Sequence, residues 1–393
     1  MRIIRRAVVF VLIENTMLTI ISLCYQYTLK PILFLFDPSH VHHRFGEIGS
    51  FLGKFKIARF LFWLLFAKKN PSLSQTIDGL HYDAPCSIAA GFDKDVQLIE
   101  ISPSLWTGFH TIGSLSAKAY AGNPGPWLVR LPSDQSILVN YGLKNRGIDA
   151  HISHLHQVMQ QGLQQPLWIS LAKTNCAEIC DRNQAIEDYC YSLIQLQKSS
   201  LWSVFEINIS CPNAFGGEDF TKPELLRLLL SAFQKLDIST PFYIKMPHNI
   251  PREQFQALLD IAMEYHVAGV VIANLQKDRS LLSEQSNTAI QNISGWLSGK
   301  VCFQATLDRI AESYRYINGR MTIVWCGWVF SADDAYEMIG HGASLIQLIT
   351  GMIFVGPQLF AEINAGLDAM LRRDGFSNVS EAVGWKKNSL FHL

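Results

Sequence analysis

The sequence has little cysteine and no excess of either charge. Eight cysteines are spread over 393 residues without a dense framework, a usage typical of free thiols in a reducing compartment. Thirty-three basic residues balance thirty-three acidic ones, so the basic face expected of a nucleic-acid-binding protein is not indicated. No internal repeat or low-complexity stretch is present. Since 49% of the residues are hydrophobic, the chain can bury a large core, which excludes intrinsic disorder.

Candidate metal ligands are also sparse. The spacing Cys176-x3-Cys180 matches no common zinc or redox signature. The HVHH cluster at 40–43 follows Asp-Pro at 37–38, a typical start of a helix. We interpret these histidines as a solvent-exposed first turn, and the sequence predicts no metal site.

The first 70 residues differ from the rest. An apolar run at 7–24 follows three arginines, and FLFWLLFA forms a second run at 60–67. No small-residue cleavage site follows the first run, which argues against a signal peptide. Glu14 and Asn15 interrupt the first run, and the second is too short to span a bilayer. We therefore predict that residues 1–70 form a helical segment lying at a membrane surface, with a spanning anchor at 7–24 as the alternative.

From about residue 80, short apolar runs alternate with amphipathic stretches. The runs are rich in β-branched or aromatic residues, as in buried strands, and helical spacing recurs between them at 222–236 and 251–265. Eight strands alternating with helices predict an α/β fold, and eight is the number that closes a (β/α)8 TIM barrel. An open doubly wound sheet is the alternative, although no G-x-G-x-x-G follows any run. The runs are 87–92, 108–114, 167–172, 204–210, 242–247, 269–274, 322–327 and 345–350.

Chemically active residues stand where these strands end, which is where TIM barrels carry their active sites. Lys94 and Lys245 would place ammonium groups in the barrel mouth, where a cation stabilises negative charge on a bound ring or phosphate. The alternative is that both are surface lysines in loops. The strand-end residues are Asp93, Lys94, Ser114, Cys211, Pro212, Asn213, Lys245, Asn274, Gly327 and Thr350.

The densest group is Asn208-Ile-Ser-Cys211-Pro-Asn213. Alternation along a strand puts Asn208 and Ser210 on one side, and the amides of Asn208 and Asn213 suit the carbonyl and imide groups of a heterocycle. Cys211 would then be placed to exchange a proton, provided that its pKa is close to neutrality. The alternative for a lone cysteine is an inert, buried side chain.

A phosphate site is suggested near the last strands. Leu297-Ser298-Gly299 and Gly327 resemble loops whose backbone N–H groups cradle a phosphate. Glycine-rich turns alone are a weak signal, so this interpretation depends on the motifs around it.

Together these motifs resemble the dihydroorotate dehydrogenases, specifically their membrane-associated, quinone-using class. The resemblance covers nearly the whole chain. Its segments are FDP…HH (36–43), AAGFDKD (89–95), IGSLSAKAYAGNPGPWLVRLP (112–132), NISCPN (208–213), IKMP (244–247), VVIAN (270–274), LSG (297–299), DDAYEMIGHGASLIQLIT (333–350), GP (356–357) and GFSNVSEAVG (375–384).

The resemblance implies an FMN-binding barrel over 75–393 that oxidises dihydroorotate to orotate in pyrimidine (UMP) biosynthesis. Residues 1–70 would give a membrane quinone access to the flavin. The implied location is the cytoplasmic face of the inner membrane in a bacterium, or the mitochondrial inner membrane in a eukaryote.

The resemblance also implies roles for individual residues. Cys211 would be the catalytic base that removes the C5 proton while the C6 hydride moves to the flavin. The substrate would be held by Lys94, Asn208, Asn213 and Asn274. The flavin would be bound by Ala90, Gly91, Lys94, Ser114, Asn208, Lys245, Ser298, Gly299, Gly327 and Thr350.

Several positions depart from the family pattern. Cys211 stands where the quinone-using class carries Ser; Val139 and Ser170 replace asparagines, and Trp296 and Trp328 replace glycines of phosphate-side motifs. A large ring at such a position takes space that backbone and phosphate would share. Two further hypotheses therefore stay open: an FMN oxidoreductase acting on another ring substrate, and a non-catalytic membrane-associated barrel.

Overall fold

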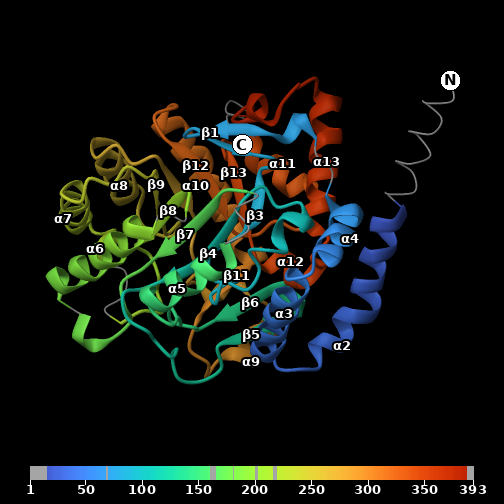
Figure 1. Cartoon of the computed structure of the whole chain (residues 1–393), viewed down its shortest axis with the longest axis horizontal. Coiled ribbons are helices and arrows are strands. Elements are labelled where there is room, and N and C mark those ends of the chain that lie inside the picture. Colours follow the sequence, from blue (N-terminus) through green and yellow to red (C-terminus); the bar gives the residue numbers. More distant parts are fainter. Residues whose placement is uncertain are drawn as a thin grey trace.

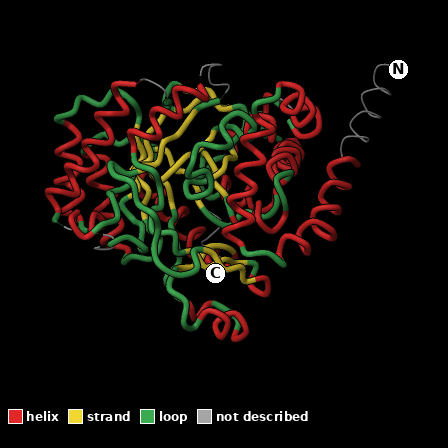
Figure 2. The backbone as a smooth tube through the Cα atoms, turned by 60° about the horizontal axis from the view of Figure 1, so that its bottom comes forward, coloured by secondary structure: helices red, strands yellow, loops and turns green. Residues whose placement is uncertain are grey.

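The centre of the protein is a parallel sheet of eight strands ringed by helices (Figures 1 and 2). The computed structural model describes residues 16–67, 70–159, 165–179, 181–199, 202–215 and 219–386. Neighbouring strands in the sheet follow one another in chain order. They are β3 (Cys86–Ile88), β4 (His110–Leu115), β7 (Leu167–Leu171), β8 (Val204–Asn208), β9 (Phe242–Met246), β10 (Gly269–Ile272), β12 (Thr322–Cys326) and β13 (Leu345–Leu348).

Backbone hydrogen bonds join β3 to β4 and close the sheet. The Gly108 N–H donates to the Cys86 carbonyl at 2.8 Å, and the Gly91 N–H donates to the Gly113 carbonyl at 2.7 Å. The predicted (β/α)8 barrel is therefore confirmed, and the open doubly wound alternative is wrong. Each predicted strand corresponds to one barrel strand.

Helices cover the outside of the barrel, and their apolar faces pack on it (Figure 1). The stretches predicted at 222–236 and 251–265 are confirmed as α7 and α8. The barrel helices are α5 (Ile148–Val158), α6 (Arg182–Ser199), α7 (Pro223–Gln234), α8 (Arg252–Glu264), α9 (Glu284–Ile290), α10 (Phe303–Ile317), α11 (Ala332–Gly340), α12 (Thr350–Val355) and α13 (Leu359–Asp374).

The amino end of the barrel is filled by aromatic side chains. Phe109, Trp168 and Tyr243 are fully buried there. A hairpin of β1 (Gln75–Ile77) and β2 (Leu80–Tyr82) packs on the same cluster through Tyr82. The Tyr243 hydroxyl donates to Asp78 in the hairpin turn at 2.5 Å. This end of the barrel is thus packed with large side chains, as is usual for a TIM barrel.

A second, antiparallel sheet was not expected from the sequence. Its strands β5 (Leu128–Leu131), β6 (Ser136–Val139) and β11 (Trp296–Gly299) are arranged in the order β11-β6-β5. Leu297 of β11 also forms a bridge with Gln276, which follows β10. Because Gln276 lies just past the carboxyl end of a barrel strand, this bridge places the small sheet beside the barrel mouth.

The chain before the barrel is helical, as predicted. A helix at Thr16–Phe34, which includes a π-turn η1 (Tyr25–Leu29) and α2 (Lys30–Phe34), is followed by α3 (Pro38–Gly53) and α4 (Lys56–Phe66). The Asp37 carboxylate accepts a hydrogen bond from the His40 N–H at 2.8 Å and caps α3. Residues 7–15 of the apolar run at 7–24 lie outside the described residues.

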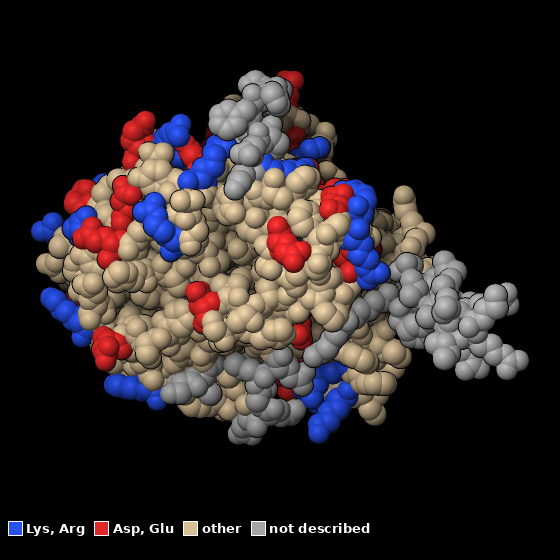
Figure 3. All heavy atoms as spheres, turned by 90° about the horizontal axis from the view of Figure 1, so that it is seen from above, with Lys and Arg blue, Asp and Glu red and all other residues tan. Residues whose placement is uncertain are grey.

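The helix at Thr16–Phe34 is long and apolar enough to cross a membrane, and only 6% of its most apolar window is buried. Most of the large apolar side chains that are exposed in the described part of the chain lie between Met17 and Leu64. By contrast, the face of the molecule shown in Figure 3 carries basic and acidic side chains side by side. The N-terminal helices therefore present the most apolar surface of the described chain.

Candidate active site

A cavity with about 850 Å³ of unfilled space opens at the carboxyl ends of the barrel strands. The lining is mainly apolar, with polar groups converging from several strands. Ten residues that were predicted from the sequence contribute to it: Ala90, Gly91, Lys94, Ser114, Asn208, Cys211, Asn213, Lys245, Asn274 and Ser298.

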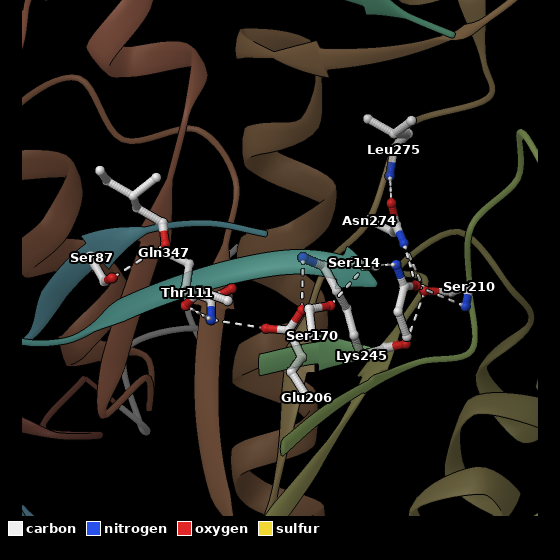
Figure 4. Close-up of polar contacts among 12 residues, drawn as sticks. Ser87, Thr111, Ser114, Ser170, Glu206, Ser210, Lys245, Asn274, Leu275 and Gln347 are labelled. Carbon is white, nitrogen blue, oxygen red and sulfur yellow. Dashed lines mark hydrogen bonds and ion pairs between the residues drawn. The ribbon is translucent and has the colours of Figure 1, made fainter. Parts of the chain in front are cut away.

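A buried ion pair lies at the base of this cavity, inside the barrel. The Lys245 ammonium is 3.4 Å from a carboxylate oxygen of Glu206, and their side chains are 5% and 0% exposed. The other Glu206 oxygen accepts a hydrogen bond from Gln347 at 2.9 Å, and the same Gln347 amide donates to Thr111. Figure 4 shows Glu206 between Lys245 and Gln347. Polar residues from β4, β8, β9 and β13 thus form one layer of the barrel interior.

The groups around Lys245 keep this lysine charged. Burial alone would lower the pKa of Lys245, but the neighbouring Cys326 and Glu206 raise it above its usual value. Burial raises the pKa of the Cys326 thiol, and the Glu206 carboxylate is the group paired with the ammonium. The lysine therefore presents a fixed positive charge to the cavity.

A chain of side-chain hydrogen bonds crosses the cavity wall above the ion pair. The Asn208 amide donates to the Ser114 hydroxyl at 2.9 Å, and this hydroxyl is 2.8 Å from that of Ser170. On the other side, the Asn274 amide donates to Asn208 at 3.2 Å and to the Ser210 hydroxyl at 3.0 Å. Ser170, which stands where the family carries Asn, is therefore part of this wall rather than a gap in it (Figure 4).

Lys94 lines the cavity opposite this chain. Its ammonium donates to the Gly91 carbonyl and lies 3.7 Å from the centre of the Tyr141 ring. Burial lowers the pKa of Lys94 to about 7. An anion bound beside Lys94 would favour its charged form. Both strand-end lysines thus face the cavity, and the alternative of exposed loop lysines is wrong.

Cys211 is half-buried and lines the cavity on the loop that follows β8. The neighbouring Asn213 uses its amide N–H to bind the Val139 carbonyl at 3.0 Å. Val139 itself adds an apolar side chain to the lining. The wall opposite Asn208 and Asn274 is therefore less polar than the family pattern implies.

Of the residues that were predicted to surround a phosphate, only one lines the cavity. Ser298 lines it, and its hydroxyl is 2.9 Å from that of Thr350, which is buried. The Gly327 N–H instead donates to the Gln347 carbonyl at 3.1 Å. At Gly299, with φ +127°, an added Cβ would lie 2.6 Å from the Ser136 Cα. Gly299 therefore allows β11 to approach β6 closely, which by itself explains the glycine.

The two tryptophans do not fill the cavity. Trp296 lines a separate polar groove, where its indole N–H donates to the Pro212 carbonyl at 3.3 Å. Trp328 is 7% exposed and stacks on Phe330 with ring centres 3.6 Å apart. Neither tryptophan is therefore among the residues that line this cavity.

A second, more apolar cavity of about 530 Å³ lies between the N-terminal helices and the barrel. It shares His42, Phe92, Leu128 and Ile353 with the first cavity. One edge is polar, because the Arg130 guanidinium donates to backbone carbonyls of the N-terminal segment at 3.0 and 3.2 Å. The Nε of Arg130 is buried without a hydrogen-bond partner among the described atoms.

Three of these residues were missed or misjudged in the sequence. His42 was expected to be exposed with its neighbours, yet its ring contacts the Phe92 carbonyl at 2.7 Å and the Tyr141 hydroxyl at 3.2 Å. Glu206 carried a usable signal, because it precedes Asn208 by two residues and must share its side of the strand. Arg130 lies within a family motif but gave no signal of its own.

Comparisons with known proteins agree with this geometry. A family profile described as "Dihydroorotate dehydrogenase" matches residues 72–371. A protein of Rhodococcus opacus named "Dihydroorotate dehydrogenase (quinone)" is 31% identical over 354 residues, which is 90% of this chain and 97% of that protein. A protein of the same name from Crocosphaera subtropica is 33% identical over 330 residues, which is 82% of this chain and 86% of that protein. The chain belongs to the dihydroorotate dehydrogenase family.

Its fold also matches a solved structure of this kind. The crystal structure of DHODH from Eimeria tenella in complex with ferulenol superposes with a TM-score of 0.77 at 23% sequence identity, covering 90% of this chain and 96% of that chain. At this identity the likeness concerns the fold. The two structures therefore share their fold over most of this chain.

We predict that Glu206→Gln lowers the free energy of unfolding by about 3 kcal/mol at pH 7, because it leaves a buried ammonium without its carboxylate. With the partner gone, burial would bring the folded-state pKa of Lys245 below its unfolded value. A charged, unpaired lysine would then destabilise the fold at low pH, and the deficit would shrink as the pH rises from that lowered pKa toward about 10. Thermal unfolding followed by circular dichroism at several pH values measures this.

The matched control is Glu206→Gln combined with Lys245→Met, which removes both charges. It should recover part of the lost stability and show no such pH dependence. An unfolding midpoint of Glu206→Gln that equals the unmodified protein's at every pH would contradict the role given to the pair.

Proposed function

We propose that this chain oxidises dihydroorotate to orotate in de novo pyrimidine biosynthesis and passes the electrons to a membrane quinone. The observation that carries the proposal is the convergence in one cavity of two lysines, three asparagines and Cys211, on a chain that belongs to the dihydroorotate dehydrogenase family. The relatives named above carry the same activity in their names.

FMN fits the cavity as its cofactor. Gly91, with φ +107°, borders the cavity without a side chain. Lys245 offers a fixed positive charge inside an otherwise closed barrel, which suits a ring that gains electrons. Ser298 and Thr350 offer paired hydroxyls on the phosphate side. When bound, the flavin would supply the hydride acceptor. Ala90, Ser114 and Asn208 would complete its contacts, with Gly299 and Gly327 shaping the surrounding backbone.

The substrate would lie between the asparagines and Lys94. Lys94 would bind its carboxylate, and the amides of Asn208, Asn213 and Asn274 would hold its ring carbonyl and N–H groups. In the reaction the C5–H bond breaks and its proton goes to the Cys211 thiolate, while the C6 hydrogen leaves as hydride. Cys211 thereby becomes a thiol and must lose this proton to solvent before the next turnover.

Replacing Cys211 tests this assignment. We expect Cys211→Ala to slow substrate-dependent flavin reduction by about 100-fold or more, the typical loss when a general base is removed, with flavin content unchanged. Stopped-flow absorbance under anaerobic conditions measures the rate. Cys302→Ala, at a buried cysteine that does not line the cavity and whose thiol donates to the Leu297 carbonyl, is the control for loss of a thiol. Undiminished reduction in Cys211→Ala would remove this residue from the proton transfer.

The second cavity would give the quinone its route to the flavin. It is lined by the N-terminal helices and reaches the first cavity at His42 and Ile353. The unpartnered Nε of Arg130 is a donor suited to a quinone carbonyl. The exposed apolar side chains between Met17 and Leu64 would rest in the membrane surface and bring this opening to the lipid. The protein would then work at the inner membrane of its bacterium or mitochondrion.

Blocking this route should separate the two half-reactions. Val41 lines the second cavity but not the first, and a bulky ring at this position would fill the second cavity. We expect Val41→Trp to lower turnover with a membrane quinone by about tenfold or more, since the acceptor can no longer approach, while reduction of a water-soluble dye stays within about twofold. Ile48→Trp, at an exposed position of the same helix, is the control for added bulk. An equal loss with quinone and with dye would contradict the proposed route.

A further inference from the structure

The loop that carries Cys211 is fastened to the small sheet by two hydrogen bonds. The indole N–H of Trp296 donates to the Pro212 carbonyl at 3.3 Å, and the Asn213 amide donates to the Val139 carbonyl at 3.0 Å. Trp296 and Val139 are direct partners in the pairing of β11 with β6. The two bonds therefore connect one cross-strand pair with the two residues that follow Cys211.

The side of this contact that carries Trp296 is held rigidly. Arg279 donates to the carbonyls of Ile290, Ile293 and Gly295 at 3.1, 2.7 and 2.9 Å, which fixes the approach to β11. At Gly295, with φ +131°, an added Cβ would lie 2.7 Å from the Val139 carbonyl oxygen. The backbone before Trp296 is thus locked against β6, so the indole is presented from a defined position.

The same strand is joined to the substrate side of the cavity. Leu297 and Gln276 exchange two backbone hydrogen bonds, at 2.8 and 2.9 Å. Gln276 is two residues from Asn274, which lines the cavity. Strand β11 is therefore hydrogen-bonded both to the loop of Cys211 and to the loop of Asn274. The Trp296 ring itself borders a different groove.

We propose that Trp296 is a positioning residue for Cys211. The indole N–H holds the Pro212 carbonyl and thereby sets where the adjacent thiol stands against the bound substrate. The departure at Trp296 thus supplies a side-chain donor to the loop of Cys211, whereas Val139 contributes only its backbone carbonyl. This inference rests on the proposed role of Cys211 as the base.

Trp296→Phe tests it by keeping a ring and removing the N–H group. We expect the maximal rate of substrate-dependent flavin reduction to fall by about tenfold, since small displacements of a reacting group are costly. The KM for dihydroorotate should change by less than about threefold, because Asn213 keeps its own bond to the Val139 carbonyl and the other substrate residues lie outside this loop. In the ligand-free protein, alkylation of Cys211 by iodoacetamide, followed by peptide mass spectrometry from pH 6 to 9, should become at least about threefold faster as the loop loosens.

Trp296→Leu is the second variant without a donor and should behave in the same way. Trp385→Phe, at a half-exposed ring packed on Tyr336 and Phe376, should leave both measurements unchanged. The inference is overturned if Trp296→Phe changes neither rate, or if lost reduction follows lost flavin content and a lower unfolding midpoint. It is also overturned if the unmodified protein reduces its flavin with dihydroorotate and Trp296→Phe changes alkylation without changing that reduction. The alkylation rates need no turnover, so they test the positioning of Cys211 even if dihydroorotate is not the substrate.

Discussion

The pairing of Lys245 with Glu206 inside the barrel is the interaction on which the proposed site depends. Most TIM barrels fill their interior with branched apolar side chains, whereas this one combines such side chains with buried aromatic rings at its amino end. Above that layer a charged pair, a glutamine and a threonine replace the apolar packing. Burying such charges is costly unless they are paired and hydrogen-bonded, and here the carboxylate satisfies both Lys245 and Gln347.

Around this charge the cavity is built from two kinds of structure. Barrel strands supply Asn208, Lys245 and Ser114, whose positions follow from the register of the sheet. Loops and the small antiparallel sheet supply Cys211, Asn213 and Val139. The strand residues are rigid because the barrel is closed, whereas the loop residues depend on specific hydrogen bonds. The positions that differ from the family pattern lie mainly in this second group.

The sequence predicted the barrel well because parallel strands buried on both faces appear as continuous apolar runs. It did not predict β5, β6 and β11, since each has only four residues and its partner can be more than a hundred residues away. The cavity residues were predicted through strand ends and family motifs. The orientation of His42 and Trp296 was not, because each depends on which distant element packs beside it.

On this proposal, the cavity at the barrel mouth holds a flavin that dihydroorotate reduces. The most direct test is the visible absorption spectrum of the detergent-purified protein before and after anaerobic addition of dihydroorotate. We expect a flavin spectrum that bleaches on addition. A flavin spectrum that persists unchanged would contradict the proposed substrate, and a protein that shows no flavin even after FMN is added would contradict the site itself.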